Sequence, residues 1–215
     1  MSPWLKIVIC VIACYLLGSV NGAIIVSKAR MHEDVRQKGS GNAGLTNFLR
    51  SYGSWLTLLV VVIDMGKVVA GCLFAQYFLK EIDAPVARMI AGVAVQVGHI
   101  FPVFFGFHGG KGVLCTGTLA IVMNWKIAAI AFTLFLIVFF TTRYVSMASF
   151  VGVVSFAIML ILQYHKNLWV CLLMAVMVVL VFFMHRGNIR RLLHGQERKT
   201  YFHKAKNEQE GGGTH

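Results

Sequence analysis

The chain has little charge and almost no proline. Only 13% of its 215 residues are charged, Asp and Glu together number 8, and there are 3 prolines. Hydrophobic residues make up 58% of the chain, and the mean hydropathy is +0.73. This composition is typical of an integral membrane protein and excludes a soluble globular domain.

Cysteine is also scarce, and its placement argues against cross-links and metal sites. The five cysteines lie within apolar runs without paired metal-ligand spacing, at Cys10, Cys14, Cys72, Cys115 and Cys171. We predict that they are small buried hydrophobic side chains. No metal and no cofactor is expected.

A covalent nucleophile is a further feature that the sequence lacks. The nucleophile-elbow pattern Gly-x-Ser-x-Gly is absent, and no cysteine lies in a basic polar loop. Chemistry by this chain is therefore expected to proceed without a covalent intermediate on the protein.

Long apolar runs account for most of the sequence. They cover residues 5–26, 54–79, 86–105, 113–123, 127–141, 147–164 and 167–184. Most approach the ~20 residues needed to cross a bilayer, and several are apolar at every position, which favours helices over barrel strands. The fold expected is an all-α integral membrane protein.

The fourth run is short, and the distribution of positive charge decides its topology. If it crosses, seven transmembrane helices place most of the 20 lysines and arginines on one side of the membrane. The positive-inside rule then predicts an N-terminus outside and a C-terminus in the cytoplasm. Residues 1–200 are expected to form a single seven-helix domain, followed by a basic tail, residues 201–215, that ends in a linker-like glycine run.

Two glycine-rich loops have the composition of anion sites. The first, residues 39–50, combines glycines with neutral donors and an arginine, at Ser40, Asn42, Thr46, Asn47 and Arg50. The second follows His99 and contains Gly109, Gly110, Lys111 and Gly112. Glycines allow backbone N–H groups to turn toward an oxyanion, and the side chains add donors and fixed charge.

Further polar segments fall on the same, cytoplasmic side in the seven-helix topology. One is the turn of residues 143–149, with Arg143, Ser146 and Ser149, and another is residues 185–191, with His185 and Asn188. Four segments that bring cations, hydroxyls, amides and imidazoles to one face indicate a site for two anionic groups at that face.

Within the second run, Asp64 and Lys67 are spaced i,i+3 and share a helix face. An unpaired charge in a span is costly, so we expect the two to pair. The pair either fixes helix packing or holds and extends the anion site, and the sequence leaves both open. His99 lies a short loop away from Lys111, which favours a role in the site.

Four segments, taken in order, resemble the motifs of the bacterial membrane glycerol-3-phosphate acyltransferases that use acyl phosphate as donor. They are residues 39–50, 98–113, 143–149 and 185–197, so the resemblance covers most of the chain. Leu45 stands where the family usually has alanine, and His108 where it usually has lysine. These departures bear on substrate preference more than on activity.

The resemblance implies a reaction and a location. A fatty acyl group would pass from acyl phosphate to the 1-hydroxyl of sn-glycerol 3-phosphate, giving lysophosphatidic acid and inorganic phosphate. The enzyme would be a multi-pass protein of the bacterial cytoplasmic (inner) membrane, in contact with membrane lipids, and a monomer. A nucleic-acid partner is not expected, because the cations are spread over loops at one membrane face.

The loop compositions, the buried pair and the resemblance together give the expected site residues, and the resemblance implies the roles of the catalytic ones. Those at the catalytic centre are Ser149, His185 and Asn188. Those that bind substrate are Ser40, Asn42, Thr46, Asn47, Arg50, Asp64, Lys67, His99, Gly109, Gly110, Lys111, Gly112, Arg143, Ser146 and Glu197.

The general base is not decided by the residues themselves. His99, His185 and a phosphate oxygen of the substrates are all candidates, and the resemblance favours the substrate phosphate. The His-x4-Asp motif of acyltransferases that use CoA or carrier-protein thioesters is absent. The alternative of a different class is a transporter for an organic phosphate, although transporters tend to place polar sites at the membrane midplane.

Overall fold

The computed structural model describes residues 1–53 and 55–200, and all regular structure in this part of the chain is helical. The α-helices are α1 Pro3–Gly18, α2 Gly22–Val26, α3 Leu45–Tyr52, α4 Leu56–Phe78, α5 Ala84–Ile100, α6 Val113–Met123, α7 Trp125–Thr142, α8 Val145–Gln163, α9 Leu168–Met184 and α10 Arg186–Leu193. A π-helical turn covers Ser27–Met31, and 3-10 turns cover Val35–Gln37 and Val103–Phe105. The expected all-α membrane architecture is confirmed. The predicted tail, residues 201–215, lies outside the described residues.

Five helical segments among the described residues are long and apolar enough to cross a membrane: Pro3–Met31, Leu56–Phe78, Ala84–Phe105, Trp125–Thr142 and Val145–Gln163. The pair α9 and α10, bent by 57°, makes a sixth if it is one span. Helix α6 corresponds to the short fourth run and has 11 residues.

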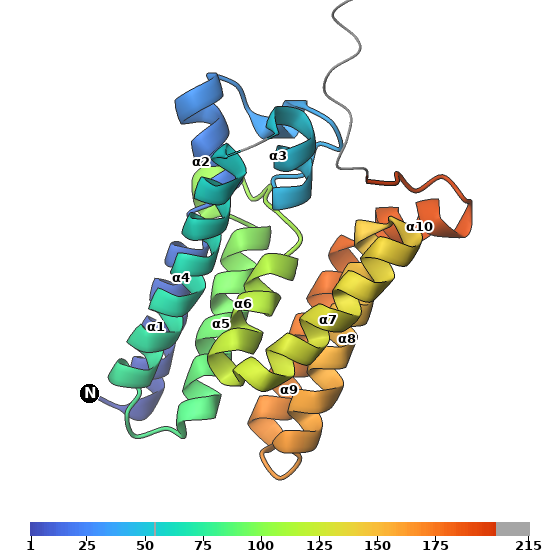
Figure 1. Ribbon diagram of the computed structural model, residues 1–215. Coiled ribbons are helices and arrows are strands. Elements are labelled where there is room, and N and C mark those ends of the chain that lie inside the picture. Colours follow the sequence, from blue (N-terminus) through green and yellow to red (C-terminus); the bar gives the residue numbers. More distant parts are fainter. Residues whose placement is uncertain (54, 201–215) are drawn as a thin grey trace, which may run out of the picture.

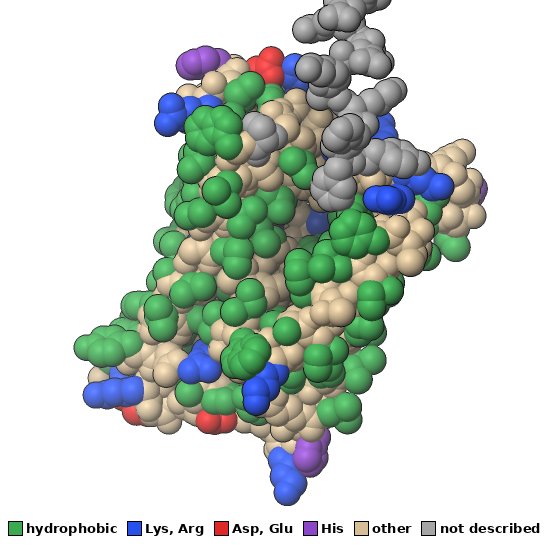
Figure 2. Space-filling view, viewed as in Figure 1, with side chains coloured by type: hydrophobic (Ala, Val, Ile, Leu, Met, Phe, Trp, Pro, Cys, Tyr) green, Lys and Arg blue, Asp and Glu red, His purple; other side chains and the backbone are tan. Residues whose placement is uncertain are grey.

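The helices form one connected bundle. Helices α1, α4 and α5 pack together, and α8 packs against both α7 and α9. The two sets are joined by α6, which contacts α4, α5, α7 and α8, and by direct packing of α5 against α9. The N-terminus lies at one end of the bundle, and α3 and α10 lie at the other (Figure 1). On the face drawn in Figure 2, hydrophobic side chains cover the middle of the molecule, and most Lys and Arg side chains lie near its two ends.

The first apolar run, predicted as one span, is interrupted between α1 and α2. Asn21 begins α2 by accepting a hydrogen bond from Ile24 N at 3.1 Å through its side-chain oxygen. The backbone carbonyls of Gly18 and Val20, at the interruption, accept hydrogen bonds from Lys67 Nζ at 3.0 and 2.7 Å. A break in a membrane helix is tolerated because other groups satisfy the freed backbone in this way.

The predicted pairing of Asp64 and Lys67 is confirmed. Lys67 Nζ lies 2.8 Å from Asp64 Oδ1, and both side chains are only 2% exposed. Asp64 Oδ1 also accepts a hydrogen bond from Gly22 N at 3.1 Å. The pair on α4 therefore binds both sides of the α1–α2 interruption.

Helices α1 and α5 approach closely next to this pair. A Cβ on Gly98 would lie 2.2 Å from the carbonyl oxygen of Tyr15, so only glycine permits the contact. The following residue, His99, then lies with its Nδ1 3.0 Å from Lys67 Nζ. Close packing thus brings α5 to the buried pair.

We expect the stabilities of Asp64 and Lys67 variants to be coupled. Lys67→Met alone should lower the free energy of unfolding by about 3–5 kcal/mol, because it leaves the Asp64 carboxylate buried without its lysine partner. Asp64→Asn/Lys67→Met should be more stable than Lys67→Met. Thermal unfolding of the purified protein in detergent, measured for both single variants and the double variant, gives the coupling.

The control is Lys6 with Glu81, an ion pair whose side chains are 23% and 52% exposed. Its double-variant cycle should be close to additive, as is usual for exposed pairs. Strict additivity at Asp64 and Lys67 as well would contradict the coupling.

Candidate active site

A cavity of about 1000 Å³ connects the glycine loops to the interior of the helix bundle. One part of its wall comes from the two loops, from α10 and from the segment after α10, and carries charged and polar side chains. The other part comes from α4, α6, α7 and α8 and is mostly apolar, with Val61, Ile121, Phe132 and Phe156 among its residues. A hollow with a cationic side chain inside it is visible in Figure 2.

The first loop is shaped by glycines and by one asparagine. Gly39 and Gly41 have φ values of 58° and 73°, a left-handed conformation that glycine adopts without steric cost. Asn47 Oδ1 accepts a hydrogen bond from Ser40 N at 2.8 Å, and its Nδ2 donates to the carbonyls of Val35 and Lys38, both at 3.0 Å. Asn47 thus holds the loop from inside rather than presenting a free amide to a ligand.

The second loop lies directly against His99. A Cβ on Gly110 would lie 2.1 Å from His99 Nε2, and Gly110 N donates to the His99 carbonyl at 3.0 Å. Gly112, with φ 82°, comes immediately before α6. Lys111 lies between these glycines, and its Nζ donates to Asn188 Oδ1.

Glu197 is the centre of a hydrogen-bond cluster that joins the C-terminal segment to α8 and α10. Its carboxylate accepts hydrogen bonds from Ser146 Oγ at 2.9 Å, Asn188 Nδ2 at 2.6 Å and Arg191 Nε at 2.8 Å. Partial burial acts to raise its pKa, but these three donors favour the ionised form and the pKa is lowered overall. Glu197 thus orients Asn188 toward Lys111.

The charge of Lys111 is sensitive to its surroundings. Burial disfavours the ammonium and lowers the pKa of Lys111 to about 8, although the nearby Glu197 carboxylate acts to raise it. Arg191 and Arg50 act in the same direction as burial. An anion bound near Lys111 would stabilise its protonated form.

Ser149 and His185 both line the cavity, and each is held by its own helix. Ser149 Oγ donates to the carbonyl of Val145 at 2.8 Å. His185 Nδ1 lies 2.8 Å from the carbonyl of Val181. Because a carbonyl only accepts, Nδ1 carries the proton in this arrangement, and Nε2 is the nitrogen able to accept one.

Arg50 reaches the C-terminal segment. Its Nη2 donates to Thr200 Oγ1 and, at 3.5 Å, to the carbonyl of Arg198. Thr200 N donates to the carbonyl of Arg143 at 2.9 Å. The last described residues therefore bridge the first loop and the turn between α7 and α8.

Most of the residues predicted for the site line this cavity. They are Ser40, Asn42, Thr46, Asn47, Arg50, Asp64, His99, Lys111, Gly112, Ser146, Ser149, His185, Asn188 and Glu197. Lys67, Gly109 and Gly110 do not line it and instead support His99 and the second loop. Arg143 is also absent from the lining, and its contact with this region is through its backbone.

The sequence argument missed several residues of the cavity. Arg191 and Arg198 belong to the lining, and Arg191 binds Glu197. Their positions within and just after the basic 185–197 segment were the available signal. The small residues that hollow the apolar part, such as Gly117, Ala131 and Gly152, carried no such signal because similar residues occur throughout the spans.

Comparison with known proteins gives a consistent assignment. The family model described as "Glycerol-3-phosphate acyltransferase" matches residues 8–195. A protein of that name from Finegoldia magna is 35% identical over 91% of this chain and 97% of its own length. Another, from Clostridioides difficile, is 37% identical over 93% and 97%.

Solved structures agree with these relatives. A crystal structure of PlsY (YgiH), an integral membrane glycerol 3-phosphate acyltransferase, in its glycerol 3-phosphate form matches with a TM-score of 0.83 and 33% identity, covering 91% of this chain and 96% of that one. The lysophosphatidic acid form matches with a TM-score of 0.79 at the same identity, covering 91% and 95%. The resemblance found in the sequence is confirmed, and the chain belongs to the integral membrane glycerol-3-phosphate acyltransferase family.

Proposed function

We propose that this chain transfers a fatty acyl group from acyl phosphate to the 1-hydroxyl of sn-glycerol 3-phosphate, releasing lysophosphatidic acid and inorganic phosphate. The observation that carries the proposal is a single cavity that joins a cationic, loop-built end to an apolar part between α6, α7 and α8. Each substrate has a phosphate, and the donor also has an acyl chain, so both kinds of wall are needed.

The polar end suits two phosphate groups. In the described part of the chain, four cationic side chains line it, at Arg50, Lys111, Arg191 and Arg198, together with the carboxylates of Asp64 and Glu197. The N-terminal ends of α3 and α6 contribute Leu45, Thr46, Val113 and Leu114 to the same cavity. Unpaired N–H groups and the helix dipole at such ends favour bound anions.

The apolar part suits the acyl chain. Its wall includes Leu114 and Ile121 of α6, Phe132 and Phe135 of α7, and Phe156 of α8. Burial of the chain there, with the phosphate held by the loops, places the acyl carbonyl between the two parts of the cavity.

The reaction is a direct displacement. The 1-hydroxyl oxygen forms a bond to the acyl carbonyl carbon, the bond from that carbon to the phosphate oxygen breaks, and phosphate leaves with its electron pair. The hydroxyl proton passes to a phosphate oxygen of the substrates, which Ser149, His185 and Asn188 position. Cations and N–H groups stabilise the negative charge that develops on the carbonyl and phosphate oxygens.

The contacts of Ser149 support this mechanism over an acyl-enzyme. Its hydroxyl donates to the backbone of its own helix, and His185 Nδ1 does the same in α9. Among the described residues no hydrogen bond joins Ser149 to His185. A nucleophilic serine requires such an adjacent base.

We also propose the orientation in the membrane. The basic loops that build the site lie at the end of the bundle opposite the N-terminus, and the described C-terminal residues lie at that same end (Figure 1). Seven crossings, with α6 as the short one, an outer N-terminus and a cytoplasmic C-terminus follow from this arrangement and the positive-inside rule. The protein would act as a monomer in the bacterial inner membrane, with a cytoplasmic active site in one domain of residues 1–200.

The donor decides between this mechanism and thioester chemistry. Purified protein given glycerol 3-phosphate should turn over acyl phosphate but neither acyl-CoA nor acyl carrier protein, because a phosphate leaving group matches the cationic loops. One inorganic phosphate should form for each lysophosphatidic acid. Rapid quench with radiolabelled acyl phosphate should trap no acylated protein, and Lys111→Ala serves as the inactive control.

A chemically competent acyl-protein, or efficient turnover with acyl-CoA alone, would overturn the mechanism. Absence of turnover with all three donors in active preparations would overturn the function.

Phosphate affinity should depend on the protonation of Lys111. Lysine is charged below its pKa, so inorganic phosphate should bind tightly below about pH 8 and progressively more weakly as the pH rises through that value. In Lys111→Arg the side chain stays charged, so the affinity for phosphate should not fall over this pH range. Thermal-shift titrations with phosphate between about pH 7 and 9 provide the measurement. Parallel pH profiles for the two proteins would show that another group controls binding.

A further inference from the structure

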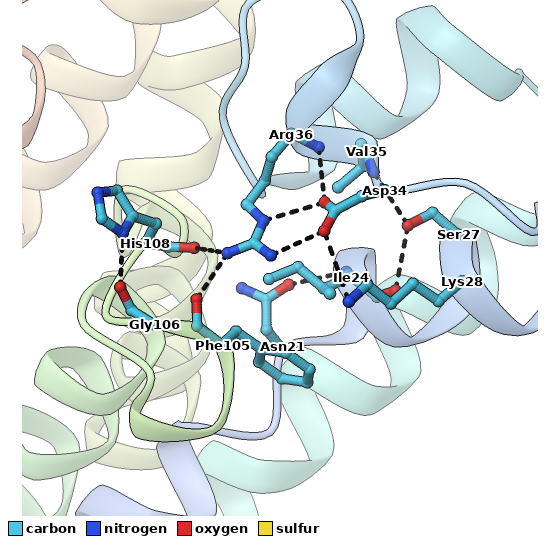
Figure 3. Close-up of polar contacts among 10 residues, drawn as sticks. All are labelled: Asn21, Ile24, Ser27, Lys28, Asp34, Val35, Arg36, Phe105, Gly106 and His108. Carbon is cyan, nitrogen blue, oxygen red and sulfur yellow. Dashed lines mark hydrogen bonds and ion pairs between the residues drawn. The ribbon is translucent and has the colours of Figure 1, made fainter.

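Arg36, which precedes the first glycine turn, makes a two-sided contact (Figure 3). On one side, its Nε and Nη2 donate to the two carboxylate oxygens of Asp34 at 3.0 and 2.7 Å. On the other side, its Nη1 donates to the carbonyls of Phe105 and His108 at 2.6 and 3.2 Å. The planar guanidinium can satisfy a carboxylate with one edge while a further N–H group points elsewhere.

The segment held by Nη1 leads directly into the second glycine loop. Between the two carbonyls lie Gly106 and Phe107, with φ values of 67° and 60°. Glycine adopts this left-handed conformation freely, but phenylalanine does so only where its surroundings impose it. Arg36 therefore holds the backbone on both sides of this pair, at Phe105 and at His108. His108 lies three residues before Lys111.

The segment that carries Arg36 is fixed to the first loop. Asp34 Oδ1 accepts a hydrogen bond from Arg36 N at 3.0 Å and so begins the turn Val35–Gln37. Val35 N donates to Ser27 Oγ at 3.2 Å (Figure 3). The Val35 carbonyl accepts from Asn47, which also binds Ser40 N in the cavity wall.

We propose that Arg36 is a positioning residue for acyl transfer, clamping the turn before Lys111 to the turn before Ser40 and thereby setting the distance between the two glycine loops. It acts through these loops, since neither Arg36 nor Asp34 is part of the cavity lining. The proposal rests on the proposed function, in which the loops bind the phosphate groups of the substrates.

A second contact between the loops makes the role testable. Ala43 N donates to the Gly109 carbonyl at 3.3 Å, and the neighbours of Ala43, Asn42 and Gly44, line the cavity. Loss of Arg36 leaves this hydrogen bond and the packing of Phe105 on the buried cluster that contains Val35, Ala43 and Phe48. The effect should therefore fall on the spacing of the loops and on substrate binding more than on folding.

The experiment compares Arg36→Gln and Arg36→Lys with Lys38→Gln. Lys38 is a matched control, because it lies in the same segment and pairs with Glu33 at 3.1 Å, with both side chains well exposed. Arg36→Gln should raise KM for glycerol 3-phosphate by about tenfold or more, since small displacements of positioning groups cost large factors in rate and binding. Arg36→Lys keeps the charge but cannot contact both sides, so it should also be impaired. Lys38→Gln should stay within about twofold of wild type.

Two results would overturn the clamp. One is KM and kcat values for both Arg36 variants within about twofold of Lys38→Gln. The other is lost activity that tracks lost folded protein, with KM of the folded fraction unchanged.

Inorganic phosphate separates this proposal from the proposed function. Phosphate should raise the melting temperature of wild type and of Lys38→Gln, and Arg36→Gln should need about tenfold more phosphate for the same shift. If wild type transfers no acyl group, the proposed function is wrong, but the phosphate titration still tests the role of Arg36. Equal phosphate responses in wild type, Lys38→Gln and Arg36→Gln would then overturn the proposal for Arg36.

Discussion

The buried pair of Asp64 and Lys67 is the interaction on which the rest of the site depends. Lys67 bonds the carbonyls that the α1–α2 interruption frees, and Asp64 bonds the first N–H group of α2. The same ammonium contacts His99, against which Gly110 packs without room for a side chain. A helix break in the membrane and a glycine turn at the active site are therefore stabilised by one charged pair, which explains why such a costly pair is present in a span.

The loops and the apolar part of the site differ in the substitutions that they tolerate. The loops are shaped by specific hydrogen bonds, such as those of Asn47 and Glu197, and each donor there has a geometric requirement. The apolar part between α6, α7 and α8 is shaped by volume alone. Substitutions that preserve volume should be tolerated in the apolar part and not in the loops.

The sequence predicted the features that arise from local composition. Five long apolar helices, the two glycine loops and the pairing of Asp64 with Lys67 follow from hydropathy, from glycine content and from an i,i+3 spacing. The interruption after Gly18 did not, because the group that stabilises it, Lys67, is distant in sequence. The contacts of Arg50 with Thr200 and of Arg36 with the carbonyls of Phe105 and His108 were missed because these partners are distant in sequence and are hydroxyl or backbone oxygens, which residue type does not mark.

The shortness of α6 has a consequence for where the substrates meet. Asn124 alone joins α6 to α7. Helix α6 has 11 residues and α7 has 18. At ~1.5 Å per residue, α6 is roughly 10 Å shorter than α7. Lys111 and Gly112 come directly before this short helix and line the same cavity as Ile121, so the proposed phosphate and acyl sites are less than about three helical turns apart along α6. In the proposed reaction, an acyl phosphate bound with its chain in the apolar part of the cavity would be shielded from bulk water and from wasteful hydrolysis.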